Sequence, residues 1–96
     1  MHEVYILHSK KLNCFYTGYT ANLLERLAYH QNAENRKFTH NASDWIVYLT
    51  IDCESKQQGL LIEKHIKSMK SKIYIENLLK HPEMIKKLQI KYLIDC

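Results

Sequence analysis

The 96-residue sequence contains little glycine, proline or cysteine, and each shortage narrows what the chain can be. With only two Gly and one Pro, it shows no repeat, linker or low-complexity segment. Its three widely spaced Cys form no CxxC pair, which argues against a zinc site and a disulfide framework. No apolar run approaches the roughly 18 residues of a membrane span, and no secretory signal pattern opens the chain. We therefore expect a soluble cytoplasmic protein with reduced cysteines.

What remains is the composition of a globular protein, 46% hydrophobic and 25% charged. A chain of this size buries roughly 60–70% of its unfolded surface, which supports one modest core. We predict a single domain over residues 1–96, with a core at about 1–80 and a C-terminal helix at about 82–93.

The basic residues are concentrated in the second half of the chain. Residues 1–55 carry five Lys or Arg against six Asp or Glu, whereas residues 56–96 carry nine Lys against four acidic residues. Such asymmetry favours a polyanionic partner such as nucleic acid. A solvated, Lys-rich helical surface would look the same, so charge alone leaves both interpretations open.

Hydrophobic periodicity predicts three strands and four helices, with a polar loop at 33–44. The strands are expected at 3–9, 14–20 and 45–52, and the helices at 22–32, 55–69, 71–80 and 82–93. This order predicts an α+β fold in which helices flank a three-stranded, mainly antiparallel sheet. The first and third strands are apolar on both faces, and we expect the first to be central.

The first two strands read as a hairpin. With a turn of either two or four residues, Tyr5, Tyr16 and Gly18 share one face, because side chains alternate along a strand. In the next helix Arg26 and His30 are four residues apart and also share a face. A phenol, a permissive glycine and a guanidinium would then converge. Half-buried strand aromatics and a surface arginine are the ordinary alternative.

The helices carry recognisable start signals. Thr20 or Asn22 can cap the first helix, and Ser55 can cap the helix at 55–69. His65 is expected at the surface. The apolar stripe of that second helix is expected to contain Leu60, Leu61, Ile62, Ile66 and Met69.

Over roughly the first 80 residues, the order and spacing of these residues resemble the GIY-YIG nuclease family. Val4-Tyr5-Ile6-Leu7 stands at the first signature tripeptide, and Tyr16-Thr17-Gly18 at the second. Arg26 follows Gly18 by eight residues, and Glu63 opens a segment similar to the one that holds the family's metal-binding carboxylate. The resemblance is strongest to small stand-alone members.

The resemblance implies a metal-dependent endonuclease that cleaves DNA, branched or flapped DNA included, in repair or recombination. It implies one divalent ion, Mg²⁺ or Mn²⁺, held by Glu63, and neither a small-molecule cofactor nor a membrane partner. The catalytic set would be Tyr5, Tyr16, Arg26, His30 and Glu63. Substrate contacts are expected from Gly18, Asn22, Lys64, Lys67 and Lys70.

The sequence also departs from the family pattern. Val4 replaces the glycine of the first tripeptide, Thr17 stands in the middle of the second, and Tyr19 occupies a position that is often basic in DNA-repair members. These departures leave the expected fold intact and bear on substrate binding. Two alternatives are a nucleic-acid-binding module without useful catalysis and a protein-interaction domain.

Overall fold

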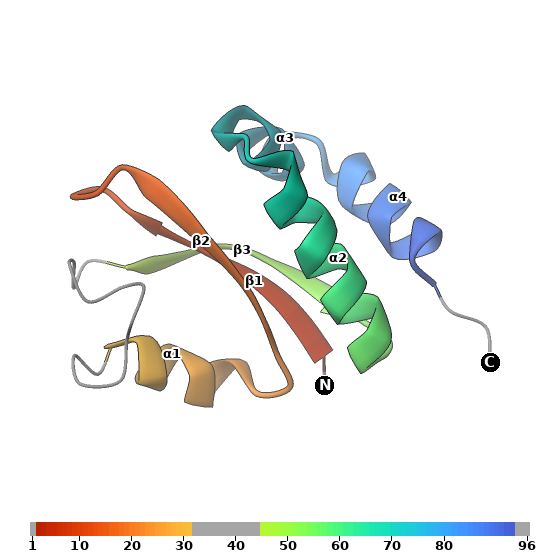
Figure 1. Ribbon diagram of the computed structural model, residues 1–96, viewed down its shortest axis with the longest axis horizontal. Coiled ribbons are helices and arrows are strands. Elements are labelled where there is room, and N and C mark those ends of the chain that lie inside the picture. The colour runs from red at the N-terminus through yellow and green to blue at the C-terminus, as the bar shows by residue number, and fades with distance from the viewer. Residues whose placement is uncertain (1, 32–44, 94–96) are drawn as a thin grey trace.

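The structure, a computed structural model, describes residues 2–31 and 45–93, with the side chains of 29–31 left out. The elements are β1 (His2–Ser9), β2 (Cys14–Thr20), α1 (Leu23–Gln31), β3 (Ile46–Cys53), α2 (Lys56–Met69), α3 (Lys72–Lys80) and α4 (Pro82–Lys91) (Figure 1). Each of the seven predicted elements is confirmed, with bounds within two residues. The polar loop predicted at 33–44 lies outside the described residues.

The three strands form one antiparallel sheet in the order β2-β1-β3, which confirms the predicted fold class. Tyr5 pairs with Gly18 and Ser9 with Cys14, so the hairpin has the four-residue turn. Asn13 ends that turn in the left-handed conformation, with φ of 50°, which asparagine tolerates well. β1 is central, as predicted, and its residues 4–7 are fully buried.

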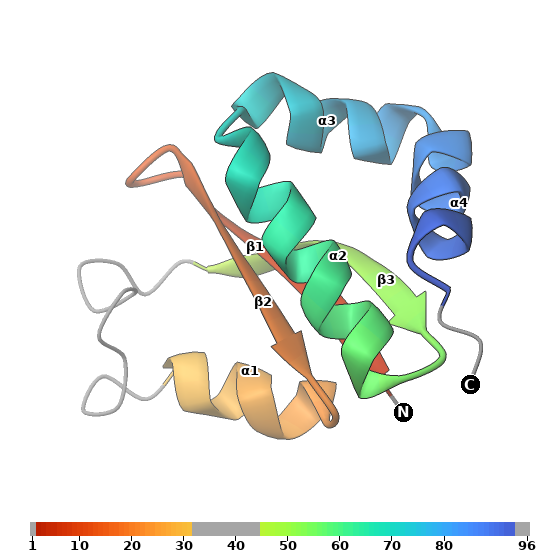
Figure 2. The same cartoon turned by 45° about the vertical axis from the view of Figure 1, so that its right-hand side comes forward.

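The core lies between one face of the sheet and the C-terminal helices. Val4, Ile6 and Ile51 of the sheet pack with Ile62 and Ile66 of α2. The core continues into α3 and α4 through Ile75, Leu78 and Leu88. Because side chains alternate along β1, Tyr5 and Leu7 point to the opposite face. In both views α1 and α2 lie on the two sides of β2, which leaves that strand between them (Figure 1, Figure 2).

The apolar stripe predicted for α2 was only partly right. Ile62 and Ile66 are buried, but Leu60, Leu61 and Met69 are 42%, 38% and 43% exposed. The buried face is instead completed by Gln58 and Gly59. Positions 58, 59, 62 and 66 follow the helical repeat of 3.6 residues, whereas Leu60 and Leu61 turn away from the sheet. Ser55 caps this helix as predicted, because its hydroxyl accepts a hydrogen bond from the Gln58 amide.

Burial in two other places differs from what the local sequence suggests. β3 is apolar on both faces in sequence but forms the sheet edge, where Ile46 and Val47 are 55% and 41% exposed. His65, expected at the surface, is half-buried: its Nδ1 lies 2.8 Å from the Tyr92 hydroxyl, and its ring contacts Tyr74 and Tyr92. Both differences arise from tertiary packing, since α4 covers one side of α2 and no described strand pairs with the outer edge of β3.

Tyr19 of β2 packs against a glycine of α2. A Cβ atom placed on Gly59 would lie 2.5 Å from Cδ1 of the Tyr19 ring, so the bare backbone of the helix leaves room for that ring. The Tyr19 hydroxyl lies 2.6 Å from Nδ1 of His2. The aromatic residue at this often basic position therefore has a packing role.

Candidate active site

The site begins at the pair formed by Tyr5 and Gly18 on neighbouring strands. A Cβ atom on Gly18 would lie 2.4 Å from the Tyr5 hydroxyl oxygen and 2.5 Å from Cζ, far inside van der Waals contact. The Tyr5 ring therefore lies across the bare backbone of Gly18 and reaches over β2. The glycine of the second tripeptide thus has a direct physical reason in this chain.

The buried Tyr5 hydroxyl lies within the electrostatic influence of three other predicted site residues. Burial raises the pKa of Tyr5 well above its ordinary value, and the neighbouring Tyr16 and Glu63 raise it further, whereas Arg26 lowers it. Tyr16 also forms a side-chain hydrogen bond with Tyr5, and the two ring centroids are 6.3 Å apart. Tyr5 therefore keeps its proton near neutral pH and acts as a hydrogen-bond donor.

Arg26 comes from the first turns of α1, which Asn22 caps. The Asn22 Oδ1 accepts a hydrogen bond of 3.2 Å from the Glu25 amide, which decides between the two predicted caps. The Thr20 hydroxyl holds the Asn22 backbone in place, through hydrogen bonds of 3.0 Å to its amide and to its carbonyl. Asn22 and Arg26 line one exposed cleft with Thr20, Ala21 and Glu25. The structure gives Asn22 a capping role; substrate contact by Asn22 stays a prediction.

His30 lies on α1, four residues after Arg26 and within the same helix. Its backbone position agrees with the shared face predicted from the spacing. Its side chain lies outside the described part of the structure, so its catalytic role stays a prediction.

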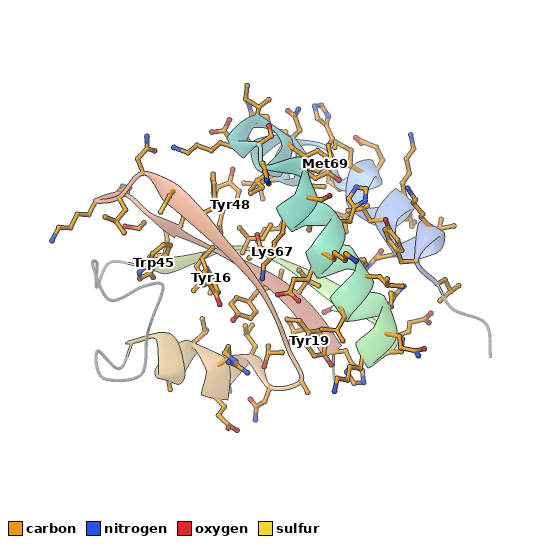
Figure 3. All side chains as sticks on the ribbon, in the orientation of Figure 1. Tyr16, Tyr19, Trp45, Tyr48, Lys67 and Met69 are labelled. Atoms are coloured by element: carbon orange, nitrogen blue, oxygen red, sulfur yellow. The ribbon has the colours of Figure 1, made fainter. Side chains whose placement is uncertain are left out.

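Glu63 approaches from α2 and is held by Lys67. The Lys67 Nζ lies 2.9 Å from the Glu63 Oε2, and 6.0 Å from the centre of the Tyr16 ring. Figure 3 shows the Lys67 side chain extending from α2 toward β2, the strand that carries Tyr16. Glu63 thus lies on the same side of the domain as Tyr16. Arg26 and Glu63 are both near enough to Tyr5 to shift its pKa. The joint catalytic role of these residues stays a prediction.

Next to Tyr16 lies an open groove of about 350 Å³ between β2 and the ends of α2 and α3. Its basic rim consists of Lys67, Lys70 and Lys72, and Phe15, Ile66 and Ile75 are among the apolar residues that line it. Lys70 occupies a left-handed C-cap, with φ of 48°, where glycine is usual. A cationic rim over an apolar and aromatic floor suits a nucleic-acid strand.

Lys64 does not line this groove, although the sequence grouped it with Lys67 and Lys70. Position 64 is rotated by about 100° from Glu63, whereas positions 67 and 70 return to the same side of the helix. Lys72 of α3 takes part instead, and its Nζ donates to the Asn13 carbonyl at the hairpin turn. Helical spacing could have separated Lys64 from the others, but Lys72 could be added only once the position of α3 was known.

Glu63 has the chemistry that a single Mg²⁺ or Mn²⁺ ion needs. Its side chain is 18% exposed and its carboxylate is paired with the Lys67 ammonium. Among the residues that the structure describes, no group of three or more His, Cys, Asp or Glu could form a metal site. Mg²⁺ is often bound by one carboxylate, its own waters and substrate phosphate, so the donor set fits this ion.

The described residues contain no helix of the length and apolarity that crossing a membrane requires.

Comparison with known proteins agrees with this arrangement. Residues 1–77 match the family model described as the GIY-YIG catalytic domain. The chain is also similar to a UPF0213 protein of Halobacterium salinarum, with 29% identity over 69 residues that cover 72% of this chain and 88% of the relative. No solved structure gave a significant match. The matched region contains both tyrosines, Gly18, Arg26 and Glu63, and the chain therefore belongs to the GIY-YIG family.

Proposed function

We propose that this protein is a divalent-metal-dependent endonuclease that cleaves DNA phosphodiester bonds. One observation carries the proposal: the Tyr5 side chain reaches across Gly18, hydrogen-bonds to Tyr16, and lies near enough to Arg26 and Glu63 for their charges to shift its pKa. Two phenols, a guanidinium and a carboxylate around one point are the groups that phosphodiester hydrolysis requires. Membership of the GIY-YIG family supports the same reaction.

Glu63 would hold the ion, Mg²⁺ or Mn²⁺, beside the scissile phosphate. When bound there, the ion supplies Lewis acidity and neutralises charge on the phosphate oxygens. The Arg26 guanidinium has a planar fork of donors that matches a phosphate. Arg26 is exposed and lines its cleft, so a phosphate can reach it. We assign it to binding that phosphate in both the ground state and the transition state.

The two tyrosines receive different roles from their environments. Tyr5 is 1% exposed and keeps its proton, so we assign it to orienting the attacking water or the phosphate by donation. Tyr16 is only half-buried and lines the groove, where a water and the substrate would have access to it. Tyr16 is therefore the better placed of the two tyrosines to contact the nucleophile.

The basic groove next to Tyr16 extends the proposal to the substrate. Lys70 and Lys72 would contact phosphates that flank the cleaved bond, which gives affinity without sequence preference. Branched or flapped DNA, as processed in repair or recombination, offers a single strand that such an open groove can hold.

A second candidate function is a nucleic-acid-binding module of the same fold without useful catalysis. The observation that favours it is the Lys67 ammonium, which already neutralises the Glu63 carboxylate. A cleavage assay separates the two candidates, with branched, flapped and plain duplex DNA and single-stranded RNA, in Mg²⁺ or Mn²⁺, against a chelator control. We expect metal-dependent cleavage of at least one DNA. Binding without cleavage under any of these conditions would favour the module.

The nuclease proposal also predicts different effects of two substitutions on DNA binding and cleavage. Arg26→Ala should weaken both DNA binding and cleavage, because Arg26 contacts phosphate before and during the reaction. Glu63→Gln should spare DNA binding and lower cleavage alone. If both variants lost binding and cleavage in the same proportion, Glu63 would be a structural residue and the metal assignment would fail.

A further inference from the structure

Lys67 places a positive charge on the carboxylate that we propose as the metal ligand. Its Nζ lies 2.9 Å from the Glu63 Oε2, a close ion pair between positions four apart on one helix. The same ammonium lies 6.0 Å from the centre of the Tyr16 ring, between the helix and the strand (Figure 3). The position expected for a metal cation is thus taken by a cation of the protein.

The two partners differ in their freedom to move. The Lys67 side chain is 52% exposed, whereas that of Glu63 is 18% exposed. Glu63 is therefore held by its surroundings, while Lys67 can swing on its flexible stem into solvent or into the groove. Among the described residues, no group of three or more His, Cys, Asp or Glu offers the ion another site. A divalent ion and Lys67 must then compete for one carboxylate, because two cations at such a short distance repel each other.

We propose that Lys67 occupies Glu63 in the metal-free protein, is displaced when the divalent ion binds, and then contacts a substrate phosphate in the groove. This inference rests on the proposed function, since it concerns the same carboxylate. Lys67 lines the groove together with Lys70 and Lys72, so its displaced ammonium remains beside the expected path of the nucleic acid. The ion and the nucleic acid would bind cooperatively, because each favours the position of Lys67 that the other needs.

The test measures Mn²⁺ binding to the free protein from the electron paramagnetic resonance signal of the unbound ion. Lys67→Gln removes the competing charge. Lys64→Gln is the matched control, because it removes the same charge from the neighbouring exposed residue that does not contact Glu63. We expect Lys67→Gln to bind Mn²⁺ about two- to fivefold more tightly than Lys64→Gln, the range that an exposed ion pair commonly represents. Equal affinities of the two variants would overturn the inference.

Two more variants connect the effect to Glu63. In a Glu63→Gln background, Lys67→Gln should no longer change Mn²⁺ affinity, and a change that persisted there would overturn the inference. Failure of this inference can be distinguished from failure of the proposed function. If the wild type cleaves DNA while Lys67→Gln and Lys64→Gln bind Mn²⁺ equally, only the competition is wrong. If Lys67→Gln binds Mn²⁺ more tightly through Glu63 but nothing is cleaved, the competition holds and the nuclease assignment falls.

Discussion

Gly18→Ala is the substitution whose effect the structure defines most sharply. The added Cβ would lie 2.4 Å from the Tyr5 hydroxyl oxygen and 2.5 Å from Cζ. Ordinary contact requires about 3.5 Å, so the ring and the strand must separate by about 1 Å. The ring cannot move aside freely, because Tyr5 is 1% exposed and its hydroxyl bonds to Tyr16.

The expected cost has a stability part and an activity part. Overpacking of this kind costs about 1–3 kcal/mol, and replacing glycine in a strand returns about 0.5–1 kcal/mol. A 1 Å displacement of a positioned group costs about 100-fold in rate. Since the displaced atom is the Tyr5 hydroxyl itself, activity should fall much more than stability alone explains.

The assay compares Gly18→Ala with Gly59→Ala, a matched collision outside the proposed site. A Cβ on Gly59 would lie 2.5 Å from the Tyr19 ring, so in both variants the new alanine Cβ pushes a tyrosine ring away. Single-turnover cleavage and thermal unfolding are measured for each, at a temperature where both remain folded. Both variants should be less stable than the wild type, and each kcal/mol of lost stability should lower Tm by about 4–8 °C. Gly18→Ala should lose about 100-fold in cleavage, and Gly59→Ala less than tenfold. Equal loss of cleavage in the two variants would refute the positioning argument.

Three further outcomes follow from the same geometry. Tyr5→Phe keeps the ring over the glycine but removes the hydroxyl, so single-turnover cleavage should fall about 100-fold or more. Circular dichroism should show that the variant remains folded. Unchanged cleavage would mean that Tyr5 has no part in the mechanism. A salt titration gives the slope of the logarithm of the DNA-binding constant against the logarithm of the salt concentration. Lys70→Gln should reduce the magnitude of this slope by about 0.9, as the loss of one phosphate contact predicts, and Lys64→Gln should reduce it less. Equal slopes for the two variants would mean that the groove is not the binding path. Burial lowers the pKa of His65, so the folded state disfavours its protonation. The contribution of neutral His65 to the free energy of unfolding is then fully present above the unfolded pKa of about 6.5 and is lost as pH falls through the folded pKa. In urea unfolding, His65→Asn should remove this part of the pH dependence. An identical pH profile of the variant and the wild type would contradict this role of His65.

Local patterns were enough to predict the elements and most of the proposed site. Strand alternation put Tyr5 and Gly18 on one face, and the four-residue hairpin turn then paired them directly. Lys67 follows Glu63 by four residues, which is about one helical turn. These relations are local, so they follow from chain geometry without knowledge of the packing.

Apart from Lys64, which helical spacing could have separated from Lys67 and Lys70, the failures depend on contacts between elements that are distant in sequence. Leu60 and Leu61 look like core residues on a helix, but Gly59 faces the sheet because the Tyr19 ring needs the room. His65 looks like a surface residue until α4 brings Tyr92 against it. The groove likewise needs the start of α3 beside β2, which no local pattern of residues indicates.

The most direct test of the account compares cleavage and DNA binding by the wild type and by Glu63→Gln. Glutamine keeps the size and polarity of Glu63. The ion pair that the change removes is with the exposed Lys67, so the free energy of unfolding should change by less than about 1 kcal/mol. In Mg²⁺ or Mn²⁺, on the DNA that the wild type cuts best, single-turnover cleavage should fall by at least about 100-fold. DNA affinity should persist or increase, because a negative charge close to phosphate has been removed. Equal cleavage by the two proteins would contradict the assignment of Glu63 as the metal ligand, and with it the proposed mechanism.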